Sequence, residues 1–327
     1  MAHRSYRVLV STDLGGDPDD IQALIHLLHF SDVLRLEGLI SSPGPDSVNE
    51  VEEIREWVKR TGLDALRAQR HEELMDEASV LSVTCQGATI PGGPGPGRET
   101  PGSHWIVERA LAQDYLRLDR PLWILAWGSL TDVAPAMHDE PTIVERVRLY
   151  SIASSNTVAD QASRDYVYQV MKERAPEMFW IENGILPRFS HDTFRGVYLG
   201  GDQQGEWGNR SFVEQNIRGR GVPVKFRRRT GDLMPWSRHP GTEEDILKEG
   251  DAASFLYLLS PVLGGIGDVD DPTQESWGGR FRRPEPSSHP NYYVDLDAPA
   301  EECQATINKW RVDFLSAWKE RWGWYDA

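Results

Sequence analysis

An acidic turn near the amino terminus limits what this chain can fold into. The apolar run of residues 6–10 predicts a strand, and apolar residues repeat at helical spacing further on, at Ile21, Leu24, Ile25 and Leu28. Four carboxylates fall between these two segments: Asp13, Asp17, Asp19 and Asp20. They therefore lie where a strand turns into a helix. Asp19 and Asp20 fall in the first helical turn, where the helix dipole favours negative charge.

The crowding of these acids favours a site for a hard cation. One or two acids at this place would need no explanation beyond helix capping. Four on one tight turn repel one another unless a cation or protons neutralise them. The spacing differs from that of an EF-hand loop, which has acids at alternate positions, a central glycine and a closing glutamate.

The order of predicted elements indicates an α/β fold. A strand at 6–11, a helix at 21–30 and a strand at 34–41 form a βαβ unit, which produces parallel pairing with a right-handed crossover. We predict a Rossmann-like, mostly parallel sheet flanked by helices, in a single domain spanning 1–327, with a packing helix near 302–320. Ligands of such sheets bind at the carboxyl ends of the strands, where the acidic turn lies.

Other polar residues fall at the same predicted edge. The apolar run Leu122–Trp127 reads as a strand buried on both faces, and a glycine-containing turn follows it. Asn156 and Asn183 follow two later strands, and Asp251 opens an apolar helix. Each has a plainer interpretation, because Asn suits loop positions and Asp suits helix N-caps.

Composition limits the partners. The formal charge of −16 makes binding to a polyanion such as nucleic acid unfavourable, whereas uncharged sugars and nucleosides are not excluded. The two cysteines form no metal-binding motif, and no apolar run reaches membrane-spanning length. No signal-peptide core precedes the first strand, so a cytoplasmic location is expected, with a secreted origin left open. A homo-oligomer is also left open.

The acidic turn resembles a known signature. Residues 11–20 are similar to the Asp-x-Asp-x-Gly-x-Asp-Asp motif of inosine–uridine-type nucleoside hydrolases. They are closer to the Gly-Gly-Asp-Pro-Asp-Asp version in the nucleoside-hydrolase-like domain of bacterial cellulose-binding proteins. Two departures from the nucleoside hydrolases stand out: Ser11 replaces the first Asp, and the loop is two residues longer.

The resemblance implies a site and a mechanism. It implies four calcium ligands: Asp13, Asp20, the main-chain carbonyl of Trp127 and Asp251. Asp13 would also take a proton from the attacking water. Three residues would hold the ribose: Asp19, Asn156 and Asn183. Gly250 stands where the family has a His that protonates the leaving base, so the leaving-group acid is open, with His104, His191 and His239 as candidates.

The resemblance thus predicts a calcium-dependent hydrolase of N-glycosidic bonds in nucleosides or related ribosyl compounds. Two alternatives remain. One is hydrolysis of another glycosidic bond, suggested by the cellulose-associated relatives and by the missing His. The other is a non-catalytic, calcium-dependent carbohydrate-binding protein, which the loss of an acid at Ser11 favours. The joint presence of the four aspartates Asp13, Asp19, Asp20 and Asp251 favours an enzyme.

Overall fold

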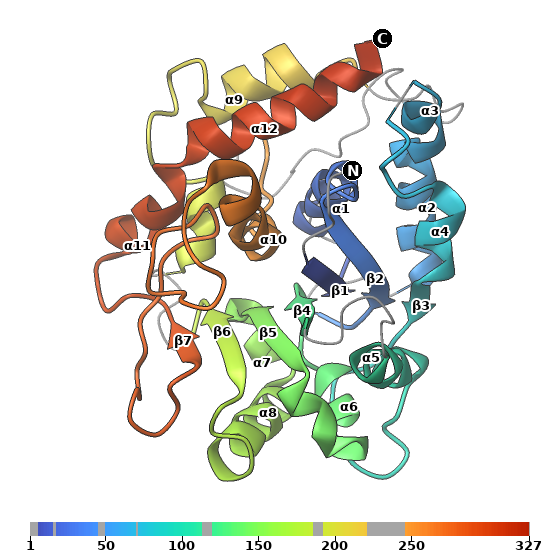
Figure 1. Ribbon diagram of the computed structural model, residues 1–327, viewed down its shortest axis with the longest axis vertical. Helices are drawn as coiled ribbons and strands as arrows, with labels where there is room; N and C mark the ends of the chain where they lie inside the picture. Colours follow the sequence, from blue (N-terminus) through green and yellow to red (C-terminus); the bar gives the residue numbers. More distant parts are fainter. Residues whose placement is uncertain are drawn as a thin grey trace.

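One parallel sheet organises the chain. The computed structural model describes residues 6–15, 18–44, 50–69, 71–112, 120–185, 192–220 and 246–326 (Figure 1). Within these ranges, seven strands pair in parallel in the order β3-β2-β1-β4-β5-β6-β7. The strands are β1 (Tyr6–Thr12), β2 (Leu34–Ser41), β3 (Thr84–Gln86), β4 (Leu122–Ala126), β5 (Val147–Ile152), β6 (Phe179–Asn183) and β7 (Tyr292–Val294). The predicted fold class is confirmed.

Strand order places a switch point in the middle of the sheet. The chain runs outward from β1 through β2 to β3, then returns to lay β4 on the other side of β1. The crevice at such a reversal is where open α/β sheets bind ligands. Ser11 pairs with Ala126 in the β1–β4 register, so the residues after these two strands emerge side by side.

Helices cover both faces of the sheet. The principal α-helices are α1 (Asp19–His29), α2 (Val51–Thr61), α3 (Leu63–Ala68), α4 (Glu77–Ser82), α5 (Pro101–Leu111), α6 (Val133–Asp139), α7 (Ser154–Ala159), α8 (Gln161–Glu173), α9 (Asn209–Phe212), α10 (Ala252–Leu259), α11 (Ala300–Asn308) and α12 (Arg311–Gly323). Short 3-10 helices are η1 (Pro141–Glu145), η3 (Thr193–Val197) and η6 (Trp324–Asp326), and π-helical turns are η4 (Val213–Ile217) and η5 (Ser260–Gly264).

Alternation along the strands divides the core into two layers. Val8 and Val10 of β1 pack in one apolar cluster, whereas Leu9 between them packs in the other. Helices α1, α2, α10 and α12 contribute to the first cluster, and α5, α6 and α8 contribute to the second (Figure 1). A strand with apolar residues on both faces is expected when helices cover both sides of a parallel sheet.

The C-terminal packing segment consists of two helices. The stretch predicted as one helix near 302–320 is α11 followed by α12, with the break at residues 309–310. Its apolar face behaves as expected, because Ile307, Phe314 and Trp318 are buried. Trp318 stacks on His26 of α1, with ring centroids 3.7 Å apart and planes within 8°. No helix in the described ranges is both long and apolar enough to cross a membrane.

Candidate functional site

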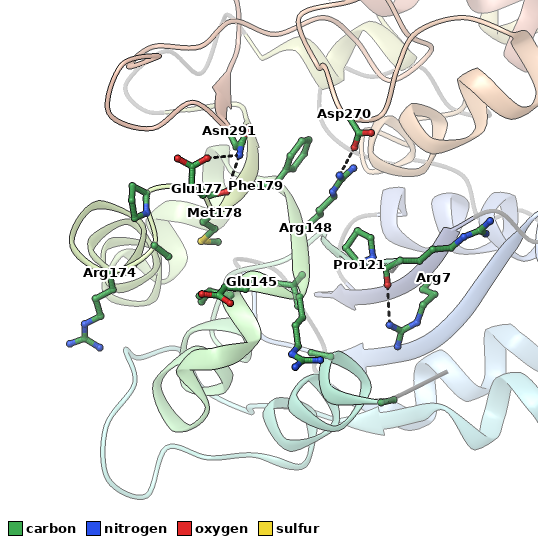
Figure 2. Close-up of a pocket in the computed structure, with 18 residues that line it drawn as sticks. Arg7, Pro121, Glu145, Arg148, Arg174, Glu177, Met178, Phe179, Asp270 and Asn291 are labelled. Carbon is green, nitrogen blue, oxygen red and sulfur yellow. Dashed lines mark hydrogen bonds and ion pairs between the residues drawn. The ribbon is translucent and has the colours of Figure 1, made fainter. Parts of the chain in front are cut away.

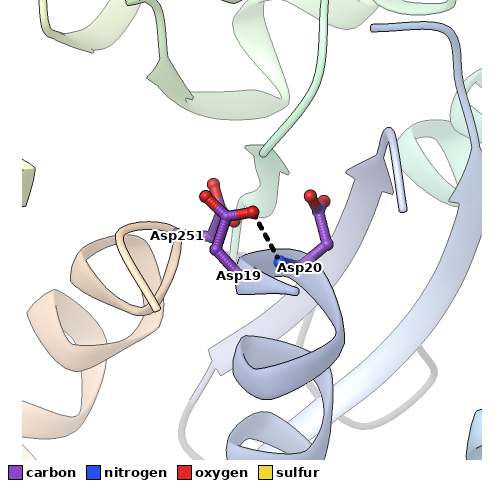
Figure 3. Close-up of side chains that lie close together, drawn as sticks. All are labelled: Asp19, Asp20 and Asp251. Atoms are coloured by element: carbon purple, nitrogen blue, oxygen red, sulfur yellow. Dashed lines mark hydrogen bonds between the residues drawn. The ribbon is translucent and has the colours of Figure 1, made fainter. Parts of the chain in front are cut away.

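The carboxyl edge of the sheet brings together three aspartates from two distant parts of the chain. One carboxylate oxygen from each of Asp19, Asp20 and Asp251 lies within 4.8 Å of the others (Figure 3). Asp19 and Asp20 form the first turn of α1, as predicted, and Asp251 immediately precedes α10. Asp20 and Asp251 are buried, whereas Asp19 is half-buried.

Asp20 is held in place from β1. The Thr12 hydroxyl donates a hydrogen bond to Asp20 Oδ1, and the same hydroxyl accepts one from the Leu14 N–H at 3.2 Å. The last residue of β1 therefore fixes both the acidic turn and the carboxylate. Ser11, one residue earlier, is fully buried, and its Oγ has no hydrogen-bond partner among the described residues.

Asp251 does not behave as a helix cap. It occupies the N-cap position of α10, but its side chain accepts no capping hydrogen bond. Burial raises the pKa of Asp251 well above its ordinary value. The carboxylates of Asp20, Asp19 and Asp13, in that order, raise this pKa further. The arrangement therefore requires either a bound proton or a cation.

The donor set fits a hard cation such as calcium. Calcium binds oxygen ligands at about 2.4 Å, so two oxygens on opposite sides of one ion lie about 4.8 Å apart. The three carboxylates meet within that separation. Carboxylate oxygens are the ligands that hard cations such as calcium, magnesium and manganese prefer, so these three residues could hold an ion of that class.

Asp13 lies beside this cluster. Its half-buried carboxylate is not among the three that meet within 4.8 Å, although its charge raises the pKa of Asp251. Two glycines enclose it. A Cβ at Gly44 would lie 1.6 Å from Asp13 Oδ2, and one at Gly128 would lie 2.9 Å from Asp13 Cβ. Any larger residue at Gly44 would displace the carboxylate.

Trp127 connects β4 to the Asp251 segment. Its indole Nε1 donates to Ser254 Oγ at 2.8 Å, and this hydroxyl donates to the Asp251 carbonyl at 2.7 Å. Ser254 thus fixes the start of α10 against the end of β4.

Asn156 lies against the Trp127 carbonyl. Asn156 Nδ2 donates to that carbonyl at 2.5 Å and to the Ile152 carbonyl at 3.1 Å. A carbonyl oxygen has two lone pairs, so this bond leaves one available on Trp127. The structure therefore brings Trp127 and Asn156 together at the edge that also carries Asp13.

Asn183 is more deeply buried than Asn156. It is fully buried, its Nδ2 donates to the Tyr150 hydroxyl at 2.8 Å, and its Oδ1 accepts from the Phe194 N–H at 3.1 Å. These contacts fit a structural role at the end of β6, where Asn183 is the last residue of the strand. Its assignment to ribose binding stays an untested prediction.

Sequence reasoning missed the residues that hold Asp251 in register. Gln22 is fully buried on α1; its Nε2 donates to the Ile246 carbonyl at 3.3 Å, and its Oε1 accepts from the Lys248 N–H at 2.6 Å. One turn later, His26 Nδ1 lies 2.8 Å from Glu249 Oε2. Gln22 and His26, four residues apart among the apolar residues of α1, were the available signal.

The proposed leaving-group acids receive no support from the described residues. His104 is exposed on α5, and His191 and His239 lie outside the described residues, as does Asp17 of the acidic turn. A pocket of about 720 Å³ lies elsewhere, at the amino ends of the strands (Figure 2). Two of its arginines are paired within the protein: Arg7 binds Glu37 at 2.7 Å, and Arg148 pairs with Asp270.

Comparison with solved structures matches this geometry to a known fold. A nucleoside hydrolase-related protein from Saccharophagus degradans, associated with carbohydrate metabolism, superposes with a TM-score of 0.70 at 21% identity, covering 98% of this chain and 72% of that one. The type III effector XopQ, solved with adenosine diphosphate ribose, gives a TM-score of 0.51 at 13% identity, covering 96% and 93%. Both likenesses show a shared fold.

The family comparison extends over most of the chain. No curated protein matches this sequence. The family model described as "Cellulose-binding Sde182, nucleoside hydrolase-like domain" matches residues 7–281, a range that includes Asp13, Asp19, Asp20 and Asp251. With the sheet order and the acidic edge in agreement, the chain belongs to the Sde182-type family of nucleoside hydrolase-like domains.

Proposed function

We propose that this protein is a calcium-dependent hydrolase of N-glycosidic bonds in nucleosides or related ribosyl compounds. The observation that carries the proposal is the convergence of Asp19, Asp20 and Asp251 at the switch point of the sheet. Buried carboxylates that face one another are costly unless a cation compensates them. An anionic site also suits glycoside cleavage, because its transition state resembles an oxocarbenium ion.

Asp20, Asp251 and the Trp127 carbonyl would hold the ion, and Asp13, which lies beside the cluster, would be the fourth ligand. When bound, calcium would engage two sugar hydroxyls and lower the pKa of a water molecule. Asp13 then accepts the proton of the water that attacks the anomeric carbon, which suits its half-buried position. Asp19 and Asn156 orient the ribose hydroxyls. The C–N bond breaks, and its electron pair leaves with the base.

The family description favours one alternative, a carbohydrate ligand in place of a nucleoside. The matched family is cellulose-binding, and the related Saccharophagus degradans structure is associated with carbohydrate metabolism. The same acidic edge would then cleave another glycosidic bond, or would bind a sugar through calcium without cleaving it. Turnover of ribosides separates these cases from the leading proposal.

The test combines metal binding with hydrolysis. Calorimetry on metal-stripped protein should show a single calcium site, and the loaded protein should release the base from inosine or uridine. Asp13→Asn should lower kcat by about 10²–10⁴-fold, the usual contribution of a general base. Asp165→Asn, an exposed change on α8, is the matched control and should behave as wild type. Calcium-dependent ribose binding without turnover would instead support the binding-only alternative.

A further inference from the structure

Two aromatic side chains, Phe194 of η3 and Tyr198 directly after it, lie beside Gly250. Gly250 directly precedes Asp251, and a Cβ at Gly250 would lie 2.8 Å from Phe194 Cδ2 and 3.6 Å from Tyr198 Cε1. Residue 250 therefore cannot carry a side chain unless Phe194 moves. Among the described residues, Phe194 of η3 and Tyr198 after it occupy the space where a side chain at position 250 would lie.

Two polar groups accompany these rings. Arg195 Nη1 donates to the Tyr198 hydroxyl at 3.4 Å. On its other side, Arg195 Nε donates at 3.2 Å to Asp192 Oδ2, which also accepts from the Ser154 hydroxyl at 3.1 Å. The Asp192 side chain is fully buried, whereas that of Arg195 is 35% exposed. The guanidinium is thus held by the buried Asp192 and remains accessible to solvent.

Tyr198 lies between opposite charges. Burial is the main cause that raises its pKa, and the carboxylate of Asp19 raises it as well. Arg195 and Lys248 lower the same pKa. The hydroxyl of Tyr198 is therefore close enough to Asp19 of the acidic cluster, and to Arg195, Lys248 and Asp192, for their charges to act on it.

Arg195 and Tyr198 can both donate hydrogen bonds toward a ligand. A guanidinium carries only donors and does not release a proton in proteins. The phenol of Tyr198 is protonated at neutral pH and can donate as well, because the ordinary pKa of a tyrosine is about 10 and burial raises it here. A pair of fixed donors favours a group that becomes negatively charged, and such donors act most strongly when charge develops in the transition state.

We propose that Arg195 and Tyr198 form the leaving-group side of the site and select substrates whose leaving group departs as an anion. This inference rests on the proposed hydrolysis. Water oxygen bonds to the anomeric carbon while the bond to the leaving atom breaks. The bonding pair goes to the leaving group, and the water proton goes to Asp13. The departing anion takes no proton, and Arg195 and Tyr198 stabilise its charge.

Leaving-group dependence tests the proposal. The substrates are inosine, whose base departs as a basic anion, and 4-nitrophenyl riboside, whose nitrophenolate is weakly basic. For Arg195→Gln we expect kcat on inosine to fall by about 10²–10³-fold, as for loss of one oxyanion donor, with KM little changed. The fall on nitrophenyl riboside should be at least tenfold smaller, because a stable anion needs less stabilisation. Tyr198→Phe should show the same pattern more weakly.

Controls keep the result interpretable. Arg280→Gln removes a half-exposed arginine outside the candidate site and should leave the activity on both substrates unchanged. Arg195→Lys keeps the charge and should recover part of the inosine activity, which also covers the case in which Arg195→Gln fails to fold. Equal losses on both substrates, or none, in the folded variants would overturn the assignment. If wild type cleaves neither riboside in calcium, the proposed hydrolysis itself fails and this inference falls with it.

Discussion

Two buried aspartates show how differently the protein treats a carboxylate. Asp132, after β4, is fully buried and accepts hydrogen bonds from Ser42 Oγ at 2.6 Å, Thr100 Oγ1 at 2.5 Å and the Ala88 N–H at 2.9 Å. Asp251 is also buried, but it caps no helix, and its strongest electrostatic neighbours are other carboxylates. Both lie near the carboxyl edge of the same sheet.

Burial alone does not distinguish a structural aspartate such as Asp132 from an aspartate of the candidate site such as Asp251. It raises the pKa of Asp132 and of Asp251 alike, so a shifted pKa does not mark the site by itself. The groups that surround each carboxylate distinguish the two residues. Hydroxyl and N–H donors compensate Asp132 internally, as three N–H groups do for Asp295, and such acids are structural. For Asp251 the carboxylates of Asp20, Asp19 and Asp13 raise the pKa, and Lys248 lowers it, so a bound proton or cation would stabilise this group.

The largest effect is expected at Asp132. Asp132→Asn replaces one acceptor oxygen with an amide that faces hydrogen-bond donors. The amide leaves one donor unpaired if it replaces Oδ2 and two if it replaces Oδ1. Each unpaired buried donor costs about 1–3 kcal/mol, so we expect a loss of about 1–6 kcal/mol in the free energy of unfolding. Urea denaturation without metal measures it. The calcium affinity of the folded variant should stay near that of wild type. A variant that stays stable but no longer binds calcium would show that Asp132 belongs to the cation site and is not a structural acid.

The same substitution at Asp251 should act in the opposite way. Asp251→Asn removes a carboxyl group whose pKa burial and the neighbouring carboxylates raise well above the ordinary value, so without metal the variant should be at least as stable as wild type at neutral pH. Calcium at 100 times its Kd would stabilise wild type by about 2.7 kcal/mol. The variant should lose most of this gain, because one ligand charge is gone. Melting temperatures of both proteins in calcium and in chelator measure the difference. If calcium stabilises the variant as much as wild type, Asp251 is not a calcium ligand.

The contrast also marks how far sequence reasoning reaches. The order of the elements and the acidic edge were predictable, because long apolar runs, helical spacing and the strand-end rule each gave a signal. Strands β3 and β7 span three residues each, too short for a readable period. The partners of Asp132 were not predictable, since Ser42 and Thr100 are distant in sequence and only the fold brings them together. For the same reason, sequence alone did not reveal Gln22 as the residue that holds the Asp251 segment.

Asp192 lies between the two classes and provides the smallest expected effect. One of its oxygens, Oδ2, accepts from Ser154 and Arg195, whereas the buried Oδ1 has no partner among the described residues. Burial is the main cause that raises the pKa of Asp192 to about 6, from an ordinary value of 3.8. The folded protein therefore holds a proton between about pH 4 and pH 6 that the unfolded chain has released.

Linkage fixes the sign of the pH effect. Where the folded state binds the extra proton, the free energy of unfolding falls as pH rises, so this contribution is complete below about pH 4 and is lost above about pH 6. Asp192→Asn removes the titration. Relative to wild type, the variant should gain on the order of 1–2 kcal/mol between pH 4 and pH 7, beyond any constant offset from its altered hydrogen bonds. Asp271→Asn is the control with the opposite sign, because hydrogen bonds lower the pKa of Asp271. Denaturation of metal-free protein across this range measures both, and a flat difference for Asp192→Asn would show that its oxygens are compensated as fully as those of Asp132.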